Sequence, residues 1–569
     1  MAREKISILF PGQDRVEYRF IPEETWHDLG FDSITEKVAK KNGEAALIQR
    51  VMTGLTDDPE VSRFRAGVFD DILRNPAIRD RLVKLLDQVK MFYDYGVVNR
   101  HAGDEAGIWD LMHRLEEYHD YIVTVEAIRE CLSDSSLKSE GLIRLRNTVD
   151  EIYRDHAFEA LKRDVEEMRT AASAVKSVTV GINLNERFEA VSLGLIGVNA
   201  KPFSRSGILK NFVSAINPRD DIHPEAEWDG KTSVYPSNPI GEEVVGGMDR
   251  MIRAGTIMRN PLLGLSMATV PSDDGSARIT RNMDAAASML LSRLVRRLKE
   301  MLGRYLNVSV KEIADLIPEM TFYVRWAEYI EKLKKEGWIF SMAEAVPAGD
   351  GVMPMTAEGF YNLKLTGTEK PENVIRNDLS FDAEKKVYIL TGANRGGKTT
   401  VTQAAGQLFL MAQSGLSVPA ERFVFAPADQ VLTHFPADED KTMDLGRLGE
   451  ECQRFKALYQ QAGASSLLLL NETFSTTSFE EGYYIAADAV RAILRRGIRT
   501  IYNTHMHKLA YELDGINREG RAKAWSLVSE TRDGKHSFRI RIAPPEGKSF
   551  ARDIAEKYGV TYEDLTADQ

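Results

Sequence analysis

The sequence predicts an α+β protein of more than one domain, with a mainly helical region over residues 1–350 and an α/β region over residues 351–569. Three observations support this prediction. Apolar residues recur at steps of three and four over much of the first region, as in amphipathic helices. After Pro347, short apolar runs alternate with helical segments. One of these runs leads into a glycine-rich loop that is typical of phosphate-binding sites.

Length and composition indicate a globular protein of several domains. The chain has 569 residues, of which 43% are hydrophobic and 28% are charged. No apolar stretch reaches the ~20 residues of a transmembrane helix, and the N-terminal residues lack the apolar segment of a signal peptide. We therefore expect no membrane contact and a cytoplasmic location. The two cysteines, Cys131 and Cys452, are too few for a disulfide framework, and we expect both to be reduced.

The acidic balance of the chain bears on its partners. A protein that grips the DNA backbone usually displays a basic surface, whereas the net charge here is −11. A net value can conceal a local basic patch. The charge therefore neither supports nor excludes nucleic-acid binding.

The helical region contains one possible strand pair and two long helices. Residues 6–10 and 16–20 read as short strands, with a turn signal at Pro11 and Gly12 between them. Residues 104–175 predict two helices that pack antiparallel through their apolar stripes, with polar residues 133–136 between them. Such stripes are packing surfaces, and we assign them no chemistry.

Residues 178–280 interrupt this helical pattern. Two runs, 178–182 and 191–196, predict strands, and the remainder is rich in proline and polar residues. A helix is again predicted over residues 320–335. The helix before it carries a basic flank, formed by Arg293, Arg296, Arg297, Lys299 and Arg304. We favour a solvated helix surface over a DNA contact for this flank.

The glycine-rich loop is the clearest functional motif. From Gly392 to Thr399 it reads G-x-x-x-x-G-K-T, between an apolar run and a helical stretch. Glycines permit positive φ and close backbone approach, so N–H groups can point at phosphate oxygens. Lys398 can reach the terminal phosphates of a nucleoside triphosphate, and Thr399 can offer a hydroxyl to Mg²⁺. The residues expected to bind the nucleotide are Gly392, Ala393, Asn394, Arg395, Gly396, Gly397, Lys398, Thr399 and Thr400.

Two further runs end in polar residues that would complete this site. The run 466–470 is followed by Asn471 and Glu472, and residues 500–504 lead to His505. At the carboxyl edge of a parallel sheet, Asn471 would join Thr399 in holding Mg²⁺. Glu472 is the candidate general base, with a strand-end salt bridge as the alternative, and His505 is the candidate γ-phosphate sensor.

The amide of Asn471 has a consequence for turnover. A carboxylate at this position would attract a divalent cation, since unit charges 4 Å apart interact by about 4 kcal/mol at an effective dielectric of about 20. An amide lacks that charge. Slow hydrolysis, or nucleotide binding with little turnover, is therefore a second possibility.

With these motifs in view, residues 374–560 resemble the ATPase domain of the MutS family, which belongs to the ABC-type ATPases. The matching segments are 377–379, 391–399, 417–420, 426–429, 471–472, 475–478, 503–505 and 547–550. The N-terminal region resembles, more weakly, the helical core and lever region of that family. The insertion at 178–280 stands where family members carry their DNA-holding clamp.

The resemblance implies ATP and Mg²⁺ as cofactors, a homodimer formed through the ATPase domains, and DNA as the partner of a mismatch-repair type of protein. The sequence departs from the family pattern in several ways. Asn471 replaces an aspartate, and Arg395 stands where methionine is usual. Gly446 and Arg447 replace the Ser-Thr of the signature segment, where Arg447 could contact a γ-phosphate across the dimer. The chain also starts at the core region, so we expect no mismatch-reading domain.

Two functional hypotheses follow. In the first, a homodimeric ATPase couples its nucleotide state to clamp and lever movement on DNA, independently of mismatches and possibly on structured or branched DNA. In the second, a nucleotide-controlled binding module with weak or no hydrolysis acts on a protein or RNA partner. Asn471 and the acidic balance favour the second hypothesis.

Overall fold

The structure is a computed structural model. It describes residues 6–11, 16–88, 108–133, 136–173, 177–184, 186, 190–199, 292–305, 308, 310–349, 353–393, 396–436, 446–518, 520–532, 535–545, 558, 560 and 565–566. The chain divides into two compact units. The first unit comprises Met1–Asp87, Ala127–Thr148 and Asp315–Gln569, and the second comprises Gln88–Glu126 and Val149–Ala314. The predicted domain boundary near residue 350 stays a prediction.

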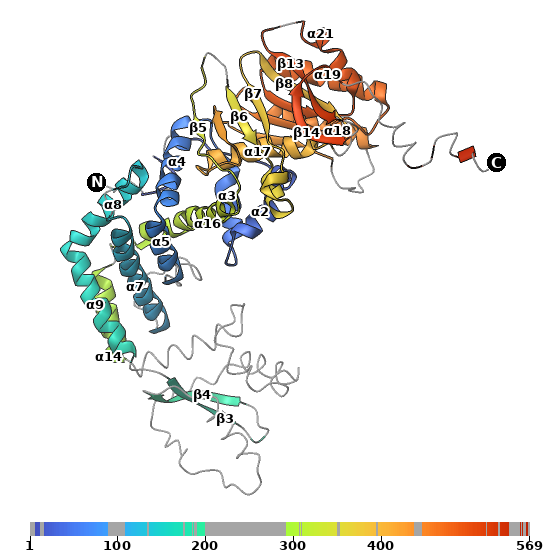
Figure 1. Cartoon of the computed structure of the whole chain (residues 1–569). Helices are drawn as coiled ribbons and strands as arrows, with labels where there is room; N and C mark the ends of the chain where they lie inside the picture. The colour runs from blue at the N-terminus through green and yellow to red at the C-terminus, as the bar shows by residue number, and fades with distance from the viewer. Residues whose placement is uncertain are drawn as a thin grey trace. The chain divides into compact units, whose positions relative to one another are not determined.

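A six-stranded sheet forms the centre of the first unit (Figure 1). Its strands, in spatial order, are β10 (Val431–His434), β11 (Leu467–Asn471), β12 (Arg499–Asn503), β8 (Lys385–Gly392), β13 (Lys523–Arg532) and β14 (Lys535–Ile542). The first five are parallel, and β14 pairs with β13 as an antiparallel edge. The near-continuous apolar runs that predicted β8 and β11 are those of strands buried on both faces.

Helices cover both faces of this sheet. Leu468 and Leu470 of β11 pack in one hydrophobic cluster with α18 (Gly446–Gln461), α19 (Phe479–Arg496) and α20 (His507–Tyr511). Leu469 points to the other face, where it approaches Gly406 of α17 (Lys398–Gln413). Within the sheet, β13 is also contacted by α21 (Leu513–Ile516).

A second, four-stranded sheet lies in the same unit. Its order is β5 (Glu344–Ala345), β9 (Arg422–Phe425), β6 (Met355–Phe360) and β7 (Asn377–Phe381). Two short 3-10 helices, η3 (Leu363–Gly367) and η4 (Pro371–Asn373), connect β6 to β7. This connection forms one wall of the candidate site described below.

The first unit also contains the N-terminal helices of the chain. They are α1 (Glu23–Asp28), α2 (Phe31–Val38), α3 (Glu44–Thr53), α4 (Pro59–Arg74) and α5 (Pro76–Gln88), with α16 (Leu316–Lys335) from later in the chain. Two glutamines of α17 reach them, since Gln403 Nε2 donates to the Asp28 carbonyl at 2.7 Å and Gln407 Nε2 to the Leu29 carbonyl at 2.8 Å. The helix predicted over residues 320–335 is confirmed by α16.

The strand pair predicted at the N-terminus is wrong. β1 (Arg19–Phe20) pairs instead with β2 (Gly54–Leu55), and residues 6–10 form no strand. The reason is a side chain distant in sequence. The N–H groups of Ile8 and Leu9 donate to Glu319 Oε2, at 2.7 and 3.2 Å, and are therefore unavailable to a neighbouring strand.

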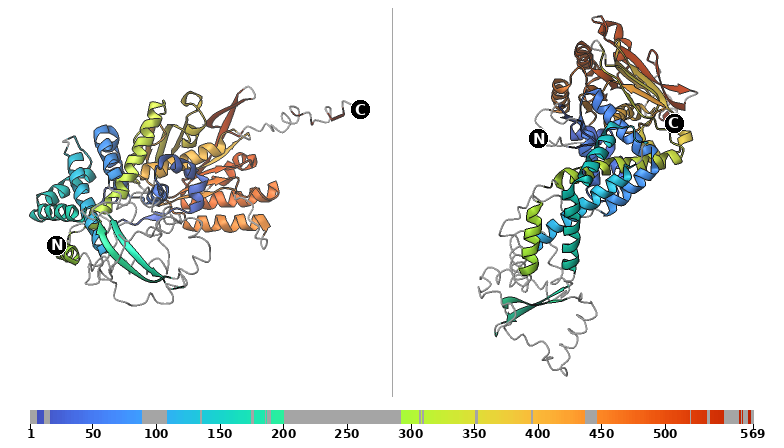
Figure 2. Two further views of the ribbon diagram at one scale, coloured as in Figure 1. Left: turned by 90° about the horizontal axis from the view of Figure 1, so that it is seen from below. Right: turned by 90° about the vertical axis from the view of Figure 1, so that its left-hand side faces the viewer.

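The second unit contains helices and one strand pair. Its described elements are most of α7 (Ile108–Cys131), the end of α8 (Glu140–Arg154), α9 (His156–Ser173), β3 (Ser177–Leu184), β4 (Ala190–Asn199), α14 (Ser292–Arg304) and α15 (Val310–Ala314). The two predicted strands are confirmed as β3 and β4, which pair antiparallel (Figure 2). The remainder of the predicted insertion, from residue 201, lies outside the described residues.

The second of the two predicted long helices is in fact two helices. The chain breaks at Asp155, whose side chain accepts a hydrogen bond from the Ala157 N–H at 2.9 Å and so starts α9. The predicted antiparallel packing holds for α7 and α9, because Lys162 pairs with Glu126 and Arg169 with Glu116.

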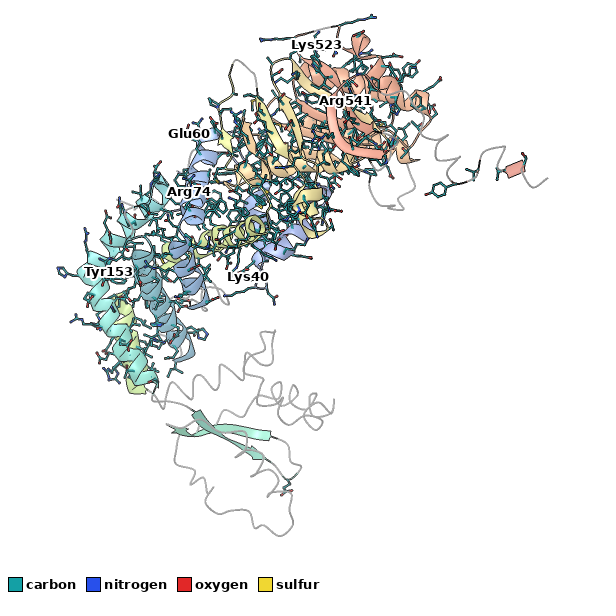
Figure 3. All side chains as sticks on the ribbon, viewed as in Figure 1. Lys40, Glu60, Arg74, Tyr153, Lys523 and Arg541 are labelled. Atoms are coloured by element: carbon teal, nitrogen blue, oxygen red, sulfur yellow. The ribbon has the colours of Figure 1, made fainter. Side chains whose placement is uncertain are left out.

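Surface ion pairs and two free thiols lie in the first unit. The surface of α4 carries local ion pairs between Arg74 and Asp70 and between Arg63 and Glu60. Figure 3 labels one partner of each pair, Arg74 and Glu60. Cys131 and Cys452 are free thiols. Among the helices that the structure describes, none is long and apolar enough to cross a membrane.

Candidate nucleotide-binding site

The parallel register of three strands brings the predicted site residues to one edge of the sheet. Asn471 at the end of β11 pairs with Asn503 at the end of β12. Asn503 in turn pairs with Leu390, two residues before the glycine-rich loop begins at Gly392. The carboxyl ends of parallel strands lie on the same side of a sheet. The sequence prediction that these segments converge is therefore confirmed.

Two glycines permit backbone conformations in the loop that residues with a side chain rarely adopt. Gly392 has a φ of +140°, and a Cβ added there would lie 2.9 Å from Ser529 Cβ. Gly397, with a φ of +83°, directly precedes α17. The loop is also tethered, since Ser529 Oγ donates to the Gly396 carbonyl at 2.6 Å. Asn394 and Arg395, both predicted to contact the nucleotide, lie outside the described residues.

Lys398 is buried at the start of α17, with a relative exposure of 6%. Its Nζ donates to the carbonyls of Gly392 and Ala393, at 3.0 and 3.1 Å. Burial lowers the pKa of this ammonium group, while the nearby Glu472 carboxylate raises it. An anion bound in the loop would compensate a cation that otherwise rests mainly on backbone carbonyls.

Thr399, Asn471 and Asn503 form a hydrogen-bonded group beside Lys398. The Oδ1 atom of Asn471 accepts from Thr399 Oγ1 at 3.2 Å and also from Asn503 Nδ2. The Oδ1 atom of Asn503 is buried and finds no hydrogen-bond partner among the described residues. Hydroxyl and amide oxygens are ligands of the kind that Mg²⁺ takes. This donor set therefore fits the predicted cation.

Asn503 is a site residue to which the sequence analysis assigned no role. Its signal was its place at the end of a predicted strand, where register sets it opposite Asn471. Among the described residues, no group of three or more His, Cys, Asp or Glu side chains could hold a metal ion. A cation here would depend on oxygens supplied by a bound phosphate, which is the usual arrangement for Mg²⁺.

Glu472 and His505 contact each other at the same edge. His505 Nε2 lies 2.9 Å from Glu472 Oε1, and their side chains are 47% and 20% exposed respectively. Glu472 has a φ of +55°, which is rare for a residue with a side chain. Its N–H donates to the Asn503 carbonyl at 2.9 Å. The predicted base and sensor are thus adjacent, and both face the cavity described next.

His507 is a second residue near this edge that the sequence analysis missed. Burial lowers its pKa, and the electrostatic interactions with His505 and Lys398 lower it further. Its Nδ1 atom is buried without a hydrogen-bond partner among the described residues. The imidazole is therefore neutral near pH 7 and adds no charge to the site.

A cavity of about 440 Å³ opens in front of the loop. This volume is within the range of sites for small molecules and cofactors. Its lining comprises Phe360, Tyr361, Asn362, Leu365, Glu369, Asn373, Val374, Ile375, Asn377, Gly396, Gly397, Lys398, Thr399, Thr400, Val401, Ala404, Glu472, His505 and Phe538. The loop, Glu472 and His505 make one polar end. The lining also includes the apolar side chains of Val374, Ile375 and Phe538, which are of the kind that pack against a flat aromatic base.

Other predicted features take less part in the described site. α18 begins at Gly446, but the side chain of Arg447 lies outside the described residues. On α14 in the second unit, Arg297 pairs with Glu167 at 2.5 Å and Arg304 with Asp164 at 3.0 Å. Both acids belong to α9. These pairs neutralise charge on the basic flank, which supports the solvated-surface interpretation.

Comparisons with known proteins relate both parts of the chain to known families. The family described as MutS domain V matches residues 388–562, and the family described as the MutS2 N-terminal domain matches residues 57–336. An "Endonuclease MutS2" of Thermus thermophilus is 29% identical over 193 residues, which are 34% of this chain and 25% of that protein.

Two further relatives show the same pattern. A "Putative endonuclease MutS2" of Bacillus subtilis is 27% identical over 267 residues, covering 46% of this chain and 33% of the relative. A "DNA mismatch repair protein MutS" of Nitratidesulfovibrio vulgaris is 25% identical over 257 residues, which are 44% of this chain and 27% of the relative. The matched part thus spans a quarter to a third of the length of these relatives.

Proposed function

This chain belongs to the MutS family, and from that premise we propose that it binds ATP with Mg²⁺ and couples its nucleotide state to movement of its helical region on DNA. The observation that carries the proposal is the placement of Lys398. The buried ammonium lies in a glycine-rich loop next to Thr399, and a cavity of about 440 Å³ opens directly in front of both. Such an arrangement supports triphosphate binding.

Each residue at the polar end has a role in this proposal. The loop backbone and Lys398 hold the phosphates, and Thr399 and Asn471 hold Mg²⁺, which when bound offsets phosphate charge. Glu472 orients a water and accepts its proton, since its carboxylate lies on the cavity wall. His505, 2.9 Å from that carboxylate, holds it in place and senses the terminal phosphate.

The second candidate function is a nucleotide-controlled binding module with little or no hydrolysis, acting on a protein or RNA partner. Asn471 favours it. This amide already accepts hydrogen bonds from Thr399 and Asn503, and it brings no negative charge to a divalent cation. The loss of one nearby charge weakens cation binding by up to several kcal/mol before desolvation is subtracted.

Partners form the remaining part of the proposal. We propose a homodimer through the ATPase regions, cytoplasmic location, and structured or branched DNA as the partner, bound without reading mismatches. The support comes from membership of the family and from the names of relatives, which are described as MutS2 endonucleases or as a DNA mismatch repair protein. On α14, Arg297 and Arg304 are already paired with Glu167 and Asp164. We therefore do not place the DNA contact there.

The first experiment separates the two candidate functions. ATP binding is measured at equilibrium, and steady-state hydrolysis is measured for wild type, Glu472→Ala and Asn471→Asp. Robust wild-type turnover that Glu472→Ala abolishes supports the ATPase. Near-zero wild-type turnover that rises in Asn471→Asp supports the binding module. If wild-type protein binds no ATP, both candidates fail.

The second experiment tests the DNA partner. Duplex, branched and single-stranded DNA are titrated at several salt concentrations, with ATP present and absent. Binding that weakens as salt rises supports phosphate contacts, because cations released from DNA oppose association at high salt. An absence of binding to every form at low salt removes DNA from the proposal, and RNA of the same forms is then titrated.

A further inference from the structure

The backbone that presents Glu472 is strained on both sides of Thr473. Glu472 has a φ of +55° and Phe474 a φ of +65°. Both are in the left-handed region, which disfavours residues that carry a Cβ. Such conformations persist when surrounding contacts over-determine them. The residue between them is therefore the place to look for those contacts.

Thr473 is held from two directions by buried side chains. Its Oγ1 lies 3.0 Å from His434 Nδ1 and 3.3 Å from the His434 carbonyl. On the other side, the Tyr502 hydroxyl donates to the Thr473 carbonyl at 2.6 Å. The three residues are at most 2% exposed. They come from the end of β10, the loop after β11 and the end of β12.

The hydrogen bonds at Thr473 form a consistent set. With its proton on Nδ1, the neutral imidazole of His434 donates to Thr473 Oγ1, and the hydroxyl then donates to the His434 carbonyl. Burial lowers the pKa of His434 to about 4, so the neutral form is the one present near pH 7. One hydroxyl thus uses both its donor and its acceptor capacity on a single neighbour.

We propose that His434, Thr473 and Tyr502 form a clamp that holds Glu472 in its left-handed conformation and so positions its carboxylate against His505 on the cavity wall. This inference rests on the proposed hydrolysis. None of the three is among the residues that line the cavity, so they are positioning residues. Their effect on chemistry reaches the substrate only through Glu472.

Apolar packing alone does not account for the arrangement. Phe474 packs against Phe455 with ring centroids 5.3 Å apart, and this contact anchors the side chain after the clamp. The peptide groups on either side of Thr473 are also hydrogen-bonded, since the Glu472 carbonyl accepts from the Ser475 N–H at 3.2 Å and the Glu451 carboxylate accepts from the Phe474 N–H. At Thr473 itself, the Tyr502 hydroxyl restrains the carbonyl and His434 restrains the side chain.

The kinetic test removes the hydroxyl while keeping the side-chain shape. We expect Thr473→Val to lower kcat for ATP by about 10-fold or more, because a displaced base loses proton-transfer efficiency, while the Kd for ATP changes by less than about twofold. Thr473→Ser keeps the hydroxyl and should restore kcat. Thr321→Val is the matched control, since Thr321 is also buried and its hydroxyl donates to the Ile317 carbonyl at 2.7 Å, remote from the cavity lining.

A second pair of variants tests the other side of the clamp. Tyr502→Phe removes the donor to the Thr473 carbonyl and should reproduce the kinetic effect of Thr473→Val. Tyr388→Phe is its control, because Tyr388 lies on the neighbouring strand β8, is equally buried, and gives its hydroxyl to the Ser380 carbonyl instead. A kcat loss of equal size in Tyr388→Phe or Thr321→Val overturns the proposal in favour of general stability.

Amide hydrogen exchange tests the clamp independently of ATP. The Glu472 N–H donates to the Asn503 carbonyl and the Ser475 N–H to the Glu472 carbonyl, so peptides covering 471–476 should exchange faster in Thr473→Val than in wild type or Thr321→Val. If the protein binds or hydrolyses no ATP, the proposed function fails. Hydrogen exchange alone then shows whether the clamp holds the backbone around Glu472. Unchanged exchange together with unchanged kcat in Thr473→Val overturns it.

Discussion

The candidate nucleotide cavity of the first unit and the α9–α14 helix pair of the second unit both contain basic side chains, but these are held differently. Lys398 is 6% exposed and its ammonium donates to two backbone carbonyls. Arg297 and Arg304 have side chains that are 56% and 63% exposed, and each contacts a carboxylate on α9. The ammonium of Lys398 is therefore held by backbone carbonyls, whereas Arg297 and Arg304 are paired with carboxylates.

Because the basic side chains are held differently, we expect different changes in conditions to affect the two regions. Buried polar groups lose hydration and respond strongly to ligands and to protonation. Exposed ion pairs are screened and respond weakly to substitution and more visibly to salt. The first region should therefore respond to nucleotide and pH, and the second to ionic strength. The following predictions test that division.

The largest effect is expected when the buried cation is removed. Lys398→Ala should weaken ATP binding by about 100-fold or more, because charge-assisted hydrogen bonds to the phosphates are lost from a partly desolvated site. Arg297→Ala is the control and should leave the Kd for ATP unchanged. Titration calorimetry or labelled-ATP binding measures both. If wild type and Lys398→Ala bound ATP with equal affinity, the loop would not be the phosphate-binding site, and the two regions would not differ in their response to ATP.

A smaller effect is expected from pH at the buried imidazole of the first unit. His434 has its pKa lowered from 6.5 to about 4, first by burial and then by Arg454. Because the folded pKa is the lower one, the unfolded chain binds more protons between these values. The stability contributed by neutral His434 is thus complete above pH 6.5 and is lost as pH falls toward 4.

The magnitude and the control follow from this shift. Between about pH 7 and about pH 5, the free energy of unfolding should fall by about 2 kcal/mol through His434 alone. His434→Asn keeps an N–H near the position of Nδ1 but does not titrate, so its denaturant midpoint should depend less on pH over the same interval. Identical pH profiles for the two proteins would show that His434 does not titrate as its burial requires.

Much of the candidate site could be predicted from the sequence. The glycine-rich loop and the apolar strands predicted the convergence of Lys398, Asn471 and Glu472, because motif, strand and parallel edge are each encoded by neighbouring residues. The assigned chemical roles stay predictions. Asn503 was missed because its place opposite Asn471 depends on strand register, which a single strand does not encode.

Errors elsewhere have the same physical origin. Residues 6–10 have the apolar composition of a strand, but their N–H groups are taken by Glu319, more than three hundred residues later. Local pattern cannot show such a partner. The break at Asp155, by contrast, was readable, since an aspartate that caps a helix is a local signal. The long apolar stripe over residues 145–172 obscured it.

The smallest effect is expected at the exposed ion pairs of the second unit. Arg297→Ala should lower the free energy of unfolding by less than about 1 kcal/mol, since its partner Glu167 is 65% exposed and remains hydrated when left alone. A double-mutant cycle with Glu167→Ala isolates the pair energy, and raising salt from about 0.05 M to about 0.5 M should reduce that energy further. Denaturant unfolding measures all four proteins. If Arg297→Ala instead weakened DNA binding strongly while stability hardly changed, the flank would be a nucleic-acid contact, and the contrast drawn between a lysine held by backbone carbonyls and arginines paired with carboxylates would have to be abandoned.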